Sequence, residues 1–326
     1  MTSEPKIAFT VLGGYLGAGK TTLLNRLLEA SHGLRIALLV NDFGAINIDS
    51  KLIETQTDQQ INLTNGCVCC GLTDGFDAAI DTLMSASARP DHIVIEASGV
   101  ADVHSLAQYG KAPGLTLDAV VVVADATSVK QKARDKYVAN TVTRQLKAAD
   151  LLVLNKIDLI SEDRAIELQE WLAKLTHDAP LVATSFCDIP EPLLLGSGAI
   201  SSHARKQKVP AEQHQHHETY VTWNFEAEKV LSYESAEAML AEFPVDLLRG
   251  KGFIATERGL LEWHKVGKYQ RLSLVSLQPG AKQRDHQDEQ SSSTANNTRL
   301  VAIGLRNQLP IEQLERVATR YLRAQA

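Results

Sequence analysis

The chain has 326 residues, of which 44% are apolar, so it is long enough for two domains with a sizeable core. Its net charge of −6 argues against nucleic acid or an anionic membrane as the main partner. No run of 18 apolar residues occurs, and residues 1–6 lack the basic-then-apolar pattern of a signal peptide, so we expect no membrane span. Three of the four cysteines lie within four positions, which indicates thiolate chemistry in a reducing cytoplasm and not a disulfide framework.

A predicted strand at 7–12 runs into a glycine-rich turn, Gly14 to Thr21, that reads G-x-x-x-x-G-K-T, the phosphate-binding P-loop. Glycines let successive backbone N–H groups point into one concavity, where they bind phosphate oxygens together with the positive end of the next helix. We expect Lys20 to reach the β- and γ-phosphates and the Thr21 hydroxyl to hold Mg²⁺. The predicted nucleotide-binding residues of this loop are Gly14, Gly17, Ala18, Gly19, Lys20, Thr21 and Thr22.

Continuous apolar runs predict strands that are buried on both faces, as in a parallel sheet covered by helices. These runs occupy residues 35–40, 92–95, 119–124 and 151–154. Polar residues follow each run at once, namely Asn41 with Asp42, Glu96, Asp125 and Asn155. Because parallel strands end at one edge of the sheet, we expect these side chains to gather beside the P-loop in an α/β fold of the P-loop NTPase class.

Cys67, Cys69 and Cys70 form a C-x-C-C motif between two glycines. Three soft thiolates favour Zn²⁺ or a similar thiophilic ion, and three ligands are too few for a closed structural site, so the metal can be handed over. Two other interpretations stay open. The cysteines could be small buried side chains, and Cys67 with Cys70 also fits a C-x-x-C redox pair.

Glu96-Ala97-Ser98-Gly99 follows a predicted strand at the position of a nucleotide-sensing loop. The Glu96 carboxylate can act on the Mg²⁺ shell, and the Gly99 N–H can contact a γ-phosphate. A solvated loop is the alternative. No catalytic base is identifiable, and Asp42, Asp49 and Glu96 are candidates for positioning the attacking water.

Asn155-Lys156-Ile157-Asp158 predicts guanine recognition. Asp158 can accept hydrogen bonds from guanine N1–H and N2–H₂, Asn155 can contact the other base edge, and the Lys156 stem can stack on the ring. Adenine would leave the carboxylate unpaired, which can give ~10⁴-fold discrimination. Thr184 and Ser185 either complete this pocket or form a plain polar loop. Cys187 is expected to be a small side chain near the base pocket.

Taken together, these motifs resemble the CobW-like GTPases, a zinc metallochaperone family related to UreG and HypB. The matching pieces are Gly13 to Thr22, Asn41 to Gly44, Asn65 to Cys70, Glu96 to Gly99 and Asn155 to Asp158. The resemblance implies GTP hydrolysis with Mg²⁺, coupled to delivery of Zn²⁺, or Co²⁺ or Ni²⁺, from the cysteine motif to client metalloproteins. The chain departs from the family at Ala45, where a glutamate is frequent. The ligand that completes the cysteine site is therefore open, with Asp42 and Asp49 as candidates.

Composition changes after about residue 190. We predict a GTPase domain at 1–195, a linker at 196–217 and a second, smaller α/β domain at 218–326, similar in position to the CobW C-terminal domain. The linker contains His214, His216 and His217, which form either a secondary metal site or part of a polar, solvated segment. In the second domain we expect strands at 220–225, 252–254, 260–263, 271–277 and 299–305, helices at 235–243 and from Pro310, and a disordered loop at 281–298.

The sequence thus predicts a cytoplasmic, GTP-hydrolysing metallochaperone whose oligomeric state is open, a homodimer among the options. Two rivals remain. An ATP-dependent small-molecule kinase would use the P-loop but has no need of Asn155 to Asp158. A non-catalytic metal buffer or redox sensor would use the cysteines alone and leaves the P-loop unexplained.

Overall fold

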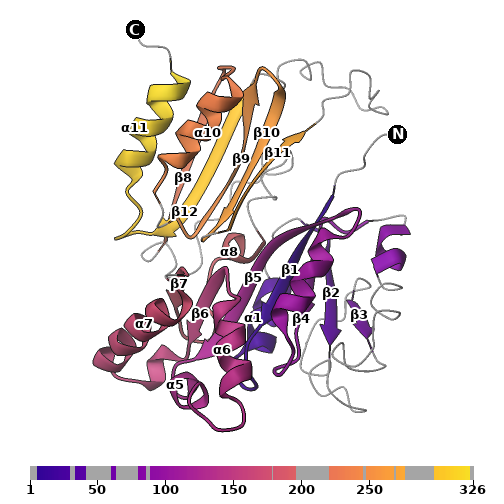
Figure 1. Ribbon diagram of the computed structural model, residues 1–326, viewed down its shortest axis with the longest axis vertical. Helices are drawn as coiled ribbons and strands as arrows, with labels where there is room; N and C mark the ends of the chain where they lie inside the picture. The colour runs from indigo at the N-terminus through magenta and orange to yellow at the C-terminus, as the bar shows by residue number, and fades with distance from the viewer. Residues whose placement is uncertain are drawn as a thin grey trace. The chain divides into compact units, whose positions relative to one another are not determined.

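The computed structural model describes residues 6–29, 34–41, 60–63, 80–85, 89–177, 179–195, 220–244, 247–267, 269–275 and 297–323. The chain divides into two compact units, Met1–Lys208 and Val209–Ala326 (Figure 1). Within the described residues, no helix is both long enough and apolar enough to cross a membrane.

The first unit is built on a seven-stranded sheet of order β3-β2-β4-β1-β5-β6-β7, in which every pairing is parallel (Figure 1). The strands are β1 (Ile7–Gly13), β2 (Ile36–Asn41), β3 (Gln60–Leu63), β4 (His92–Glu96), β5 (Leu115–Asp125), β6 (Leu151–Asn155) and β7 (Leu181–Ala183). The predicted parallel sheet is confirmed. Sequence reasoning missed β3 and the first four residues of β5, because Thr116 and Asp118 interrupt the apolar run there.

Helices pack on both faces of this sheet. They are α1 (Lys20–Glu29), α4 (Val103–Ala107), α5 (Val129–Lys132), α6 (Ala139–Lys147), α7 (Glu162–Thr176) and α8 (Glu191–Leu195), with 3₁₀ turns η2 (Gln108–Lys111) and η3 (Ile157–Leu159) and a further helical stretch at 80–85. Local sequence explains where the longest one begins. Ser161 caps α7 by accepting a hydrogen bond from the Arg164 N–H, and Glu162 and Asp163 place negative charge at its positive end.

The strand register brings the predicted polar residues to one edge. Leu12, one residue before β1 ends, lies beside Glu96, and Asp125 lies beside Asn155. On the other side of β4, Val40 lies beside Glu96. The carboxyl ends of five neighbouring strands, β2, β4, β1, β5 and β6, therefore lie at the edge where β1 turns into α1, as a parallel sheet requires.

The second unit is a five-stranded antiparallel sheet of order β11-β10-β9-β12-β8 with helices α10 and α11 on one face (Figure 1). Its elements are β8 (Tyr220–Ala227), α10 (Tyr233–Ala241), β9 (Arg249–Thr256), β10 (Gly259–Val266), β11 (Tyr269–Val275), β12 (Thr298–Leu305) and α11 (Ile311–Leu322). The prediction of a second, smaller α/β domain is confirmed. Several boundaries differ from the prediction: α10 ends at Ala241 and not at 243, and β9 is longer than 252–254. Thr298, assigned to the loop at 281–298, begins β12, and its hydroxyl accepts a hydrogen bond from the Ala255 N–H.

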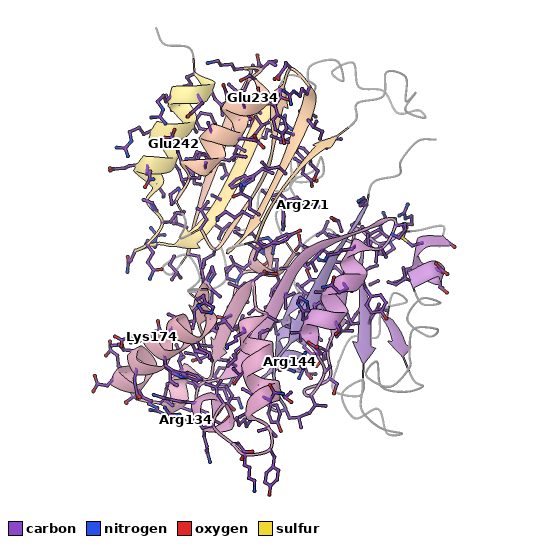
Figure 2. The ribbon with its side chains drawn as sticks, in the orientation of Figure 1. Arg134, Arg144, Lys174, Glu234, Glu242 and Arg271 are labelled. Atoms are coloured by element: carbon purple, nitrogen blue, oxygen red, sulfur yellow. The ribbon has the colours of Figure 1, made fainter. Side chains whose placement is uncertain are left out.

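Aromatic packing fills the space between sheet and helices in the second unit. The ring of Phe243 lies edge-to-face against Trp223 at 5.9 Å and against Trp263 at 5.4 Å between centroids. The two helices are also joined at the surface by Glu242, labelled in Figure 2, whose carboxylate accepts hydrogen bonds from Arg320 and from the Tyr321 hydroxyl.

A group of polar side chains is buried in the sheet of the first unit, on β1, β4 and β5. Thr10 Oγ1 lies 2.8 Å from His92 Nε2 and 3.3 Å from Asp118 Oδ2. Nearby, the Asp150 carboxylate accepts a hydrogen bond of 2.8 Å from the Val120 N–H. Burial, with the charge of Asp118 acting in the same direction, outweighs that hydrogen bond and raises the pKa of Asp150 to about 6.

We predict that Asp150→Asn stabilises the first unit at pH 7 and leaves its stability near pH 4 unchanged. The native state keeps the Asp150 proton over a pH range in which the unfolded chain has lost it, so stability falls as pH rises from about 4 to about 6. Asparagine keeps an oxygen for the Val120 N–H and carries no charge. Because the carboxylate is part-exposed, we expect a gain of about 1–2 kcal/mol in the free energy of unfolding.

Hydrogen exchange of peptides from β5 and β6, measured at several pH values, isolates this unit from the other. Equal slopes of stability against pH in the two proteins would contradict the prediction.

Candidate functional site

The turn between β1 and α1 has the backbone of a phosphate-binding loop. Gly14, Gly17 and Gly19 all have positive φ angles, of 137°, 77° and 114°. A Cβ atom on Gly14 would lie 2.4 Å from the Val123 carbonyl oxygen, so the loop runs directly against β5. Only glycine fits such a conformation at such a distance, which is why the sequence needs glycine there.

Lys20 begins α1 and turns back over the loop. Its Nζ donates a hydrogen bond of 3.0 Å to the Gly14 carbonyl and lies 4.0 Å from Glu96 Oε1 at the end of β4. Both side chains are buried, with 9% and 3% of their residues' surface exposed. Thr21 is part-exposed and Thr22 exposed in the first turn of the same helix. A cation, a carboxylate and a hydroxyl therefore lie at the positive end of one helix, which suits a phosphate with its metal ion.

The loop after β4 packs against the phosphate loop. The Ala97 N–H donates to the Leu12 carbonyl at 2.9 Å, and the Ala101 N–H closes a tight turn onto the Ser98 carbonyl at 2.9 Å. A Cβ atom on Gly99 would lie 2.8 Å from the Leu16 backbone nitrogen. Glu96 and Gly99 thus lie beside the P-loop, as their places in the sequence predict.

The side chain of Asn155, at the end of β6, forms hydrogen bonds to two loops. Its Nδ2 donates to the Ala18 carbonyl at 3.0 Å, and its Oδ1 accepts from the Cys187 N–H at 2.9 Å. The side chain is buried, and a Cβ atom on Gly19 would lie 2.4 Å from its Nδ2. Both ends of the Asn155 amide are therefore used inside the protein, where they fix the P-loop relative to the loop after β7.

Lys156 adopts a left-handed conformation, with φ at 65°, and crosses to the phosphate loop. Its Nζ donates to the Gly17 carbonyl and to Asp125 Oδ2, each at 2.8 Å. Burial acts to raise the pKa of Asp125, but hydrogen bonds from Lys156 and Thr127 outweigh it and hold that pKa below its ordinary value. The carboxylate is therefore ionised and anchors Lys156, which belongs to the segment predicted to recognise guanine. Asp158 lies exposed on η3.

The loop after β7 is ordered by its own hydrogen bonds. Thr184 is buried, and its hydroxyl bonds to the Asp188 carbonyl at 2.9 Å, while its own carbonyl accepts from the Ile157 N–H at 3.3 Å. Burial raises the pKa of the Cys187 thiol to about 12, and its Sγ donates to the Gly19 carbonyl at 3.3 Å. Cys187 is therefore a neutral, small side chain beside the P-loop, in agreement with the sequence-based prediction, and not a thiolate ligand.

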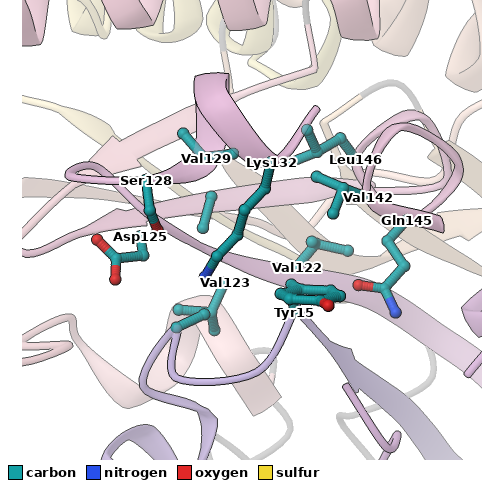
Figure 3. A pocket seen from close by; sticks show the side chains of 12 residues that line it. Tyr15, Val122, Val123, Asp125, Ser128, Val129, Lys132, Val142, Gln145 and Leu146 are labelled. Carbon is teal, nitrogen blue, oxygen red and sulfur yellow. The ribbon is translucent and has the colours of Figure 1, made fainter. Parts of the chain in front are cut away.

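Two residues of α5 and α6 that sequence reasoning missed also contact this site. Lys132 Nζ donates to the Leu16 carbonyl at 3.3 Å and lies 5.0 Å from the centre of the Tyr15 ring. Gln145 hydrogen-bonds to the loop that contains Gly99. Figure 3 shows both side chains beside Tyr15, around a cavity of about 20 Å³. Neither residue belongs to a motif, and only the packing of α5 and α6 brings them to the loop.

The remaining predicted residues lie outside the described part of the chain. They are Asp42, Asp49, Cys67, Cys69, Cys70, His214, His216 and His217. Among the residues that are described, no group of three or more His, Cys, Asp or Glu side chains could hold a metal ion.

We predict that Gly19→Ala damages the phosphate loop more than Gly17→Ala. Both glycines have positive φ, so each alanine should cost about 1 kcal/mol or more of backbone strain. A Cβ on Gly17 meets open space, whereas on Gly19 it displaces Asn155 and breaks that residue's two hydrogen bonds, for a total of about 3 kcal/mol. Hydrogen exchange of the first unit without nucleotide measures both losses, and equal losses would be the contrary result.

Two family models match this chain, and they fall on the two compact units of the fold. Residues 8–183 match the family described as CobW/HypB/UreG, nucleotide-binding domain, and residues 220–318 match the cobalamin synthesis protein cobW C-terminal domain.

Curated relatives span most of the chain. The zinc chaperone CobW of a Sinorhizobium species is 31% identical over 345 residues, covering 93% of this chain and 94% of the relative. The zinc chaperone YjiA of Escherichia coli K12 is 31% identical over 264 residues, covering 76% of this chain and 81% of the relative. A crystal structure of zinc-bound YjiA GTPase aligns with a TM-score of 0.47 at 24% identity, over 98% of this chain and 100% of that one. The family match and the two relatives establish that the chain belongs to the CobW/HypB/UreG family of P-loop GTPases.

Proposed function

We propose that this protein binds GTP with Mg²⁺, hydrolyses it, and uses the cycle to deliver a thiophilic metal, zinc foremost, to client metalloproteins. The observation that carries the proposal is the convergence of Lys20 from the start of α1, Glu96 from the end of β4 and Lys156 from just after β6 around one phosphate loop. This convergence occurs in a chain whose relatives are named zinc chaperones.

Phosphate binding is assigned to the loop and the first turn of α1. Lys20 exchanges the Gly14 carbonyl for the β- and γ-phosphates and meets the charge that builds there in the transition state. The Thr21 hydroxyl and the Glu96 carboxylate supply the hard oxygen donors that Mg²⁺ prefers, and the bound ion would neutralise phosphate charge. Gly99 contacts the γ-phosphate through its N–H.

Guanine recognition is assigned to the segment after β6. Lys156 is held at both the P-loop and Asp125, so its stem is fixed where a base can stack on it. Asp158 is exposed two residues further on, available to accept the two guanine N–H donors. In this proposal Asn155 acts by bracing the P-loop against the Cys187 loop, in addition to any contact with the base.

The transferable metal is assigned to Cys67, Cys69 and Cys70. β3 ends at Leu63, which pairs with Asn41 at the same sheet edge as the P-loop. Cys67 follows Leu63 by four residues, so the covalent chain holds it within about 14 Å of that edge. Asp42 and Asp49 are candidates for the completing ligand, and His214, His216 and His217 for a secondary capture site. A cytoplasmic location, a client metalloprotein and a homodimer also stay predictions.

We predict that Asp158→Asn weakens GTP binding and shifts preference toward xanthosine triphosphate. An asparagine amide can donate to the C2 carbonyl of xanthine but cannot accept both guanine donors. The unmodified protein should bind GTP at least ~10³-fold more tightly than ATP, as measured by calorimetry. Equal affinities for ATP and GTP would refute the guanine assignment and support a kinase-like site.

We also predict that metal and nucleotide bind cooperatively. If the γ-phosphate orders the loops at Gly99 and after β2, the thiolates gain ligand geometry, and hydrolysis releases it. By linkage, metal tightens GTP by the factor with which GTP tightens metal, about 5–150-fold for typical couplings.

A Zn²⁺ competition titration with a chromophoric chelator tests this coupling, run with a GTP analogue, with GDP and without nucleotide. The control is a protein with Cys67→Ala, Cys69→Ala and Cys70→Ala together. Identical zinc affinities in the three nucleotide states would reject the coupling. Zinc binding that persists in the control would move the site, with His214, His216 and His217 tested next.

A further inference from the structure

The side chain of Gln145 bonds to the loop that follows Glu96. It projects from α6, is only 2% exposed, and its Nε2 donates hydrogen bonds to the Gly99 carbonyl at 3.2 Å and to the Ala101 carbonyl at 2.9 Å. An amide nitrogen has two N–H donors, so both are used on this one turn. The two neighbouring acceptors are carbonyl oxygens, and this fixes which way round the amide lies.

The same turn also lies against the phosphate loop. A Cβ atom on Gly99 would lie 2.7 Å from Leu16 Cδ2 and 2.8 Å from the Leu16 nitrogen. Gly99 therefore contacts both Leu16 and the Gln145 amide. A shift of Gly99 toward or away from a bound phosphate changes its contacts with both.

The carbonyl end of the Gln145 amide makes no comparable hydrogen bonds within the described part of the chain. Among the described residues, no hydrogen bond to its buried Oε1 is found. Figure 3 shows that oxygen on the side of Tyr15, at the cavity of about 20 Å³. A leucine or methionine would fill this space as well, so apolar packing does not explain a glutamine here, whereas its two donors do.

A second connection from α6 lies at the surface. Arg144 donates to Asp102 Oδ2 at 2.6 Å, and Asp102 caps α4 through the His104 N–H. The side chains of this pair are 62% and 35% exposed, so water and salt screen the interaction. The buried Gln145 bonds are the stronger constraint, because breaking them leaves carbonyl groups unsatisfied away from water.

We propose that Gln145 is a positioning residue for nucleotide-state sensing, holding the turn Ser98–Ala101 so that the Gly99 N–H meets the γ-phosphate. This inference rests on the proposed function, since it requires that the site bind GTP. It makes a distinct prediction, because GDP has no γ-phosphate and does not use Gly99. Loss of the Gln145 donors weakens GTP and leaves GDP binding intact.

The test uses the full-length protein with Mg²⁺ and two substitutions, Gln145→Met and Gln145→Glu. Methionine keeps the length of the side chain without donors, and glutamate keeps its shape while replacing the NH₂ group. We expect each to raise the Kd of a non-hydrolysable GTP analogue about tenfold, to leave the Kd of GDP within about twofold, and to lower kcat about tenfold. Arg144→Leu on the same helix is the control and should change each value less than about twofold.

A loss of fold stability alone would weaken both nucleotides together, so the ratio of the two Kd values separates positioning from a general structural role. An unchanged ratio in either folded variant overturns the inference while leaving the proposed function in place. A wild-type protein that binds neither guanine nucleotide overturns the proposed function, and this inference with it. The glutamate variant is isosteric and decides the question should the methionine variant not fold.

Discussion

Three lysine ammonium groups hold the carbonyl oxygens of the phosphate loop, and the rest of the site depends on this arrangement. The pairs are Lys20 with Gly14, Lys132 with Leu16 and Lys156 with Gly17. In a trans peptide the C=O and the following N–H point in opposite directions, so a carbonyl held on one side directs its N–H to the other. The lysines come from α1, α5 and the segment after β6, so a correctly formed loop requires all three elements to be in place.

The other carbonyls of the loop are also bonded. Ala18 donates its N–H to the Tyr15 carbonyl, Asn155 Nδ2 binds the Ala18 carbonyl, and Cys187 Sγ donates to that of Gly19. No glycine-rich turn of this length could hold such a conformation alone, because glycine loses the most entropy on ordering. Besides the local bonds of Lys20 and Ala18, the constraint is supplied by residues more than a hundred positions away, which the parallel topology brings to one edge.

Most strands of the first unit and the phosphate loop could be predicted from the sequence, because both depend on local chemistry. Apolar runs marked most strands of the first unit, and the spacing of Gly14, Gly19 and Lys20 defined the loop. Contacts between residues that only tertiary packing brings together could not be predicted from the sequence. The β3 strand has only four residues, and Lys132 and Gln145 sit in ordinary helical positions with no motif. The contact of Asn155 with the base stays a prediction, whereas its bonds to Ala18 and Cys187 depend on the loop after β7 and could not be read from the motif.

Contacts also connect the phosphate loop to helices α5 and α6. Leu16 bonds through its carbonyl to Lys132 on α5 and packs through its backbone nitrogen against Gly99, which in turn bonds to Gln145 on α6. Lys132 on α5 therefore bonds to Leu16, Gln145 on α6 bonds to Gly99, and Leu16 and Gly99 lie against each other. Packed protein interiors move between discrete arrangements and do not deform smoothly, so under the proposed role of Gln145 a shift at Gly99 would be accommodated at α6. Glu96 ends β4 two residues before the turn Ser98–Ala101 and lies 4.0 Å from Lys20. The residues proposed to contact the metal ion, the γ-phosphate and α6 therefore form one continuous stretch of backbone.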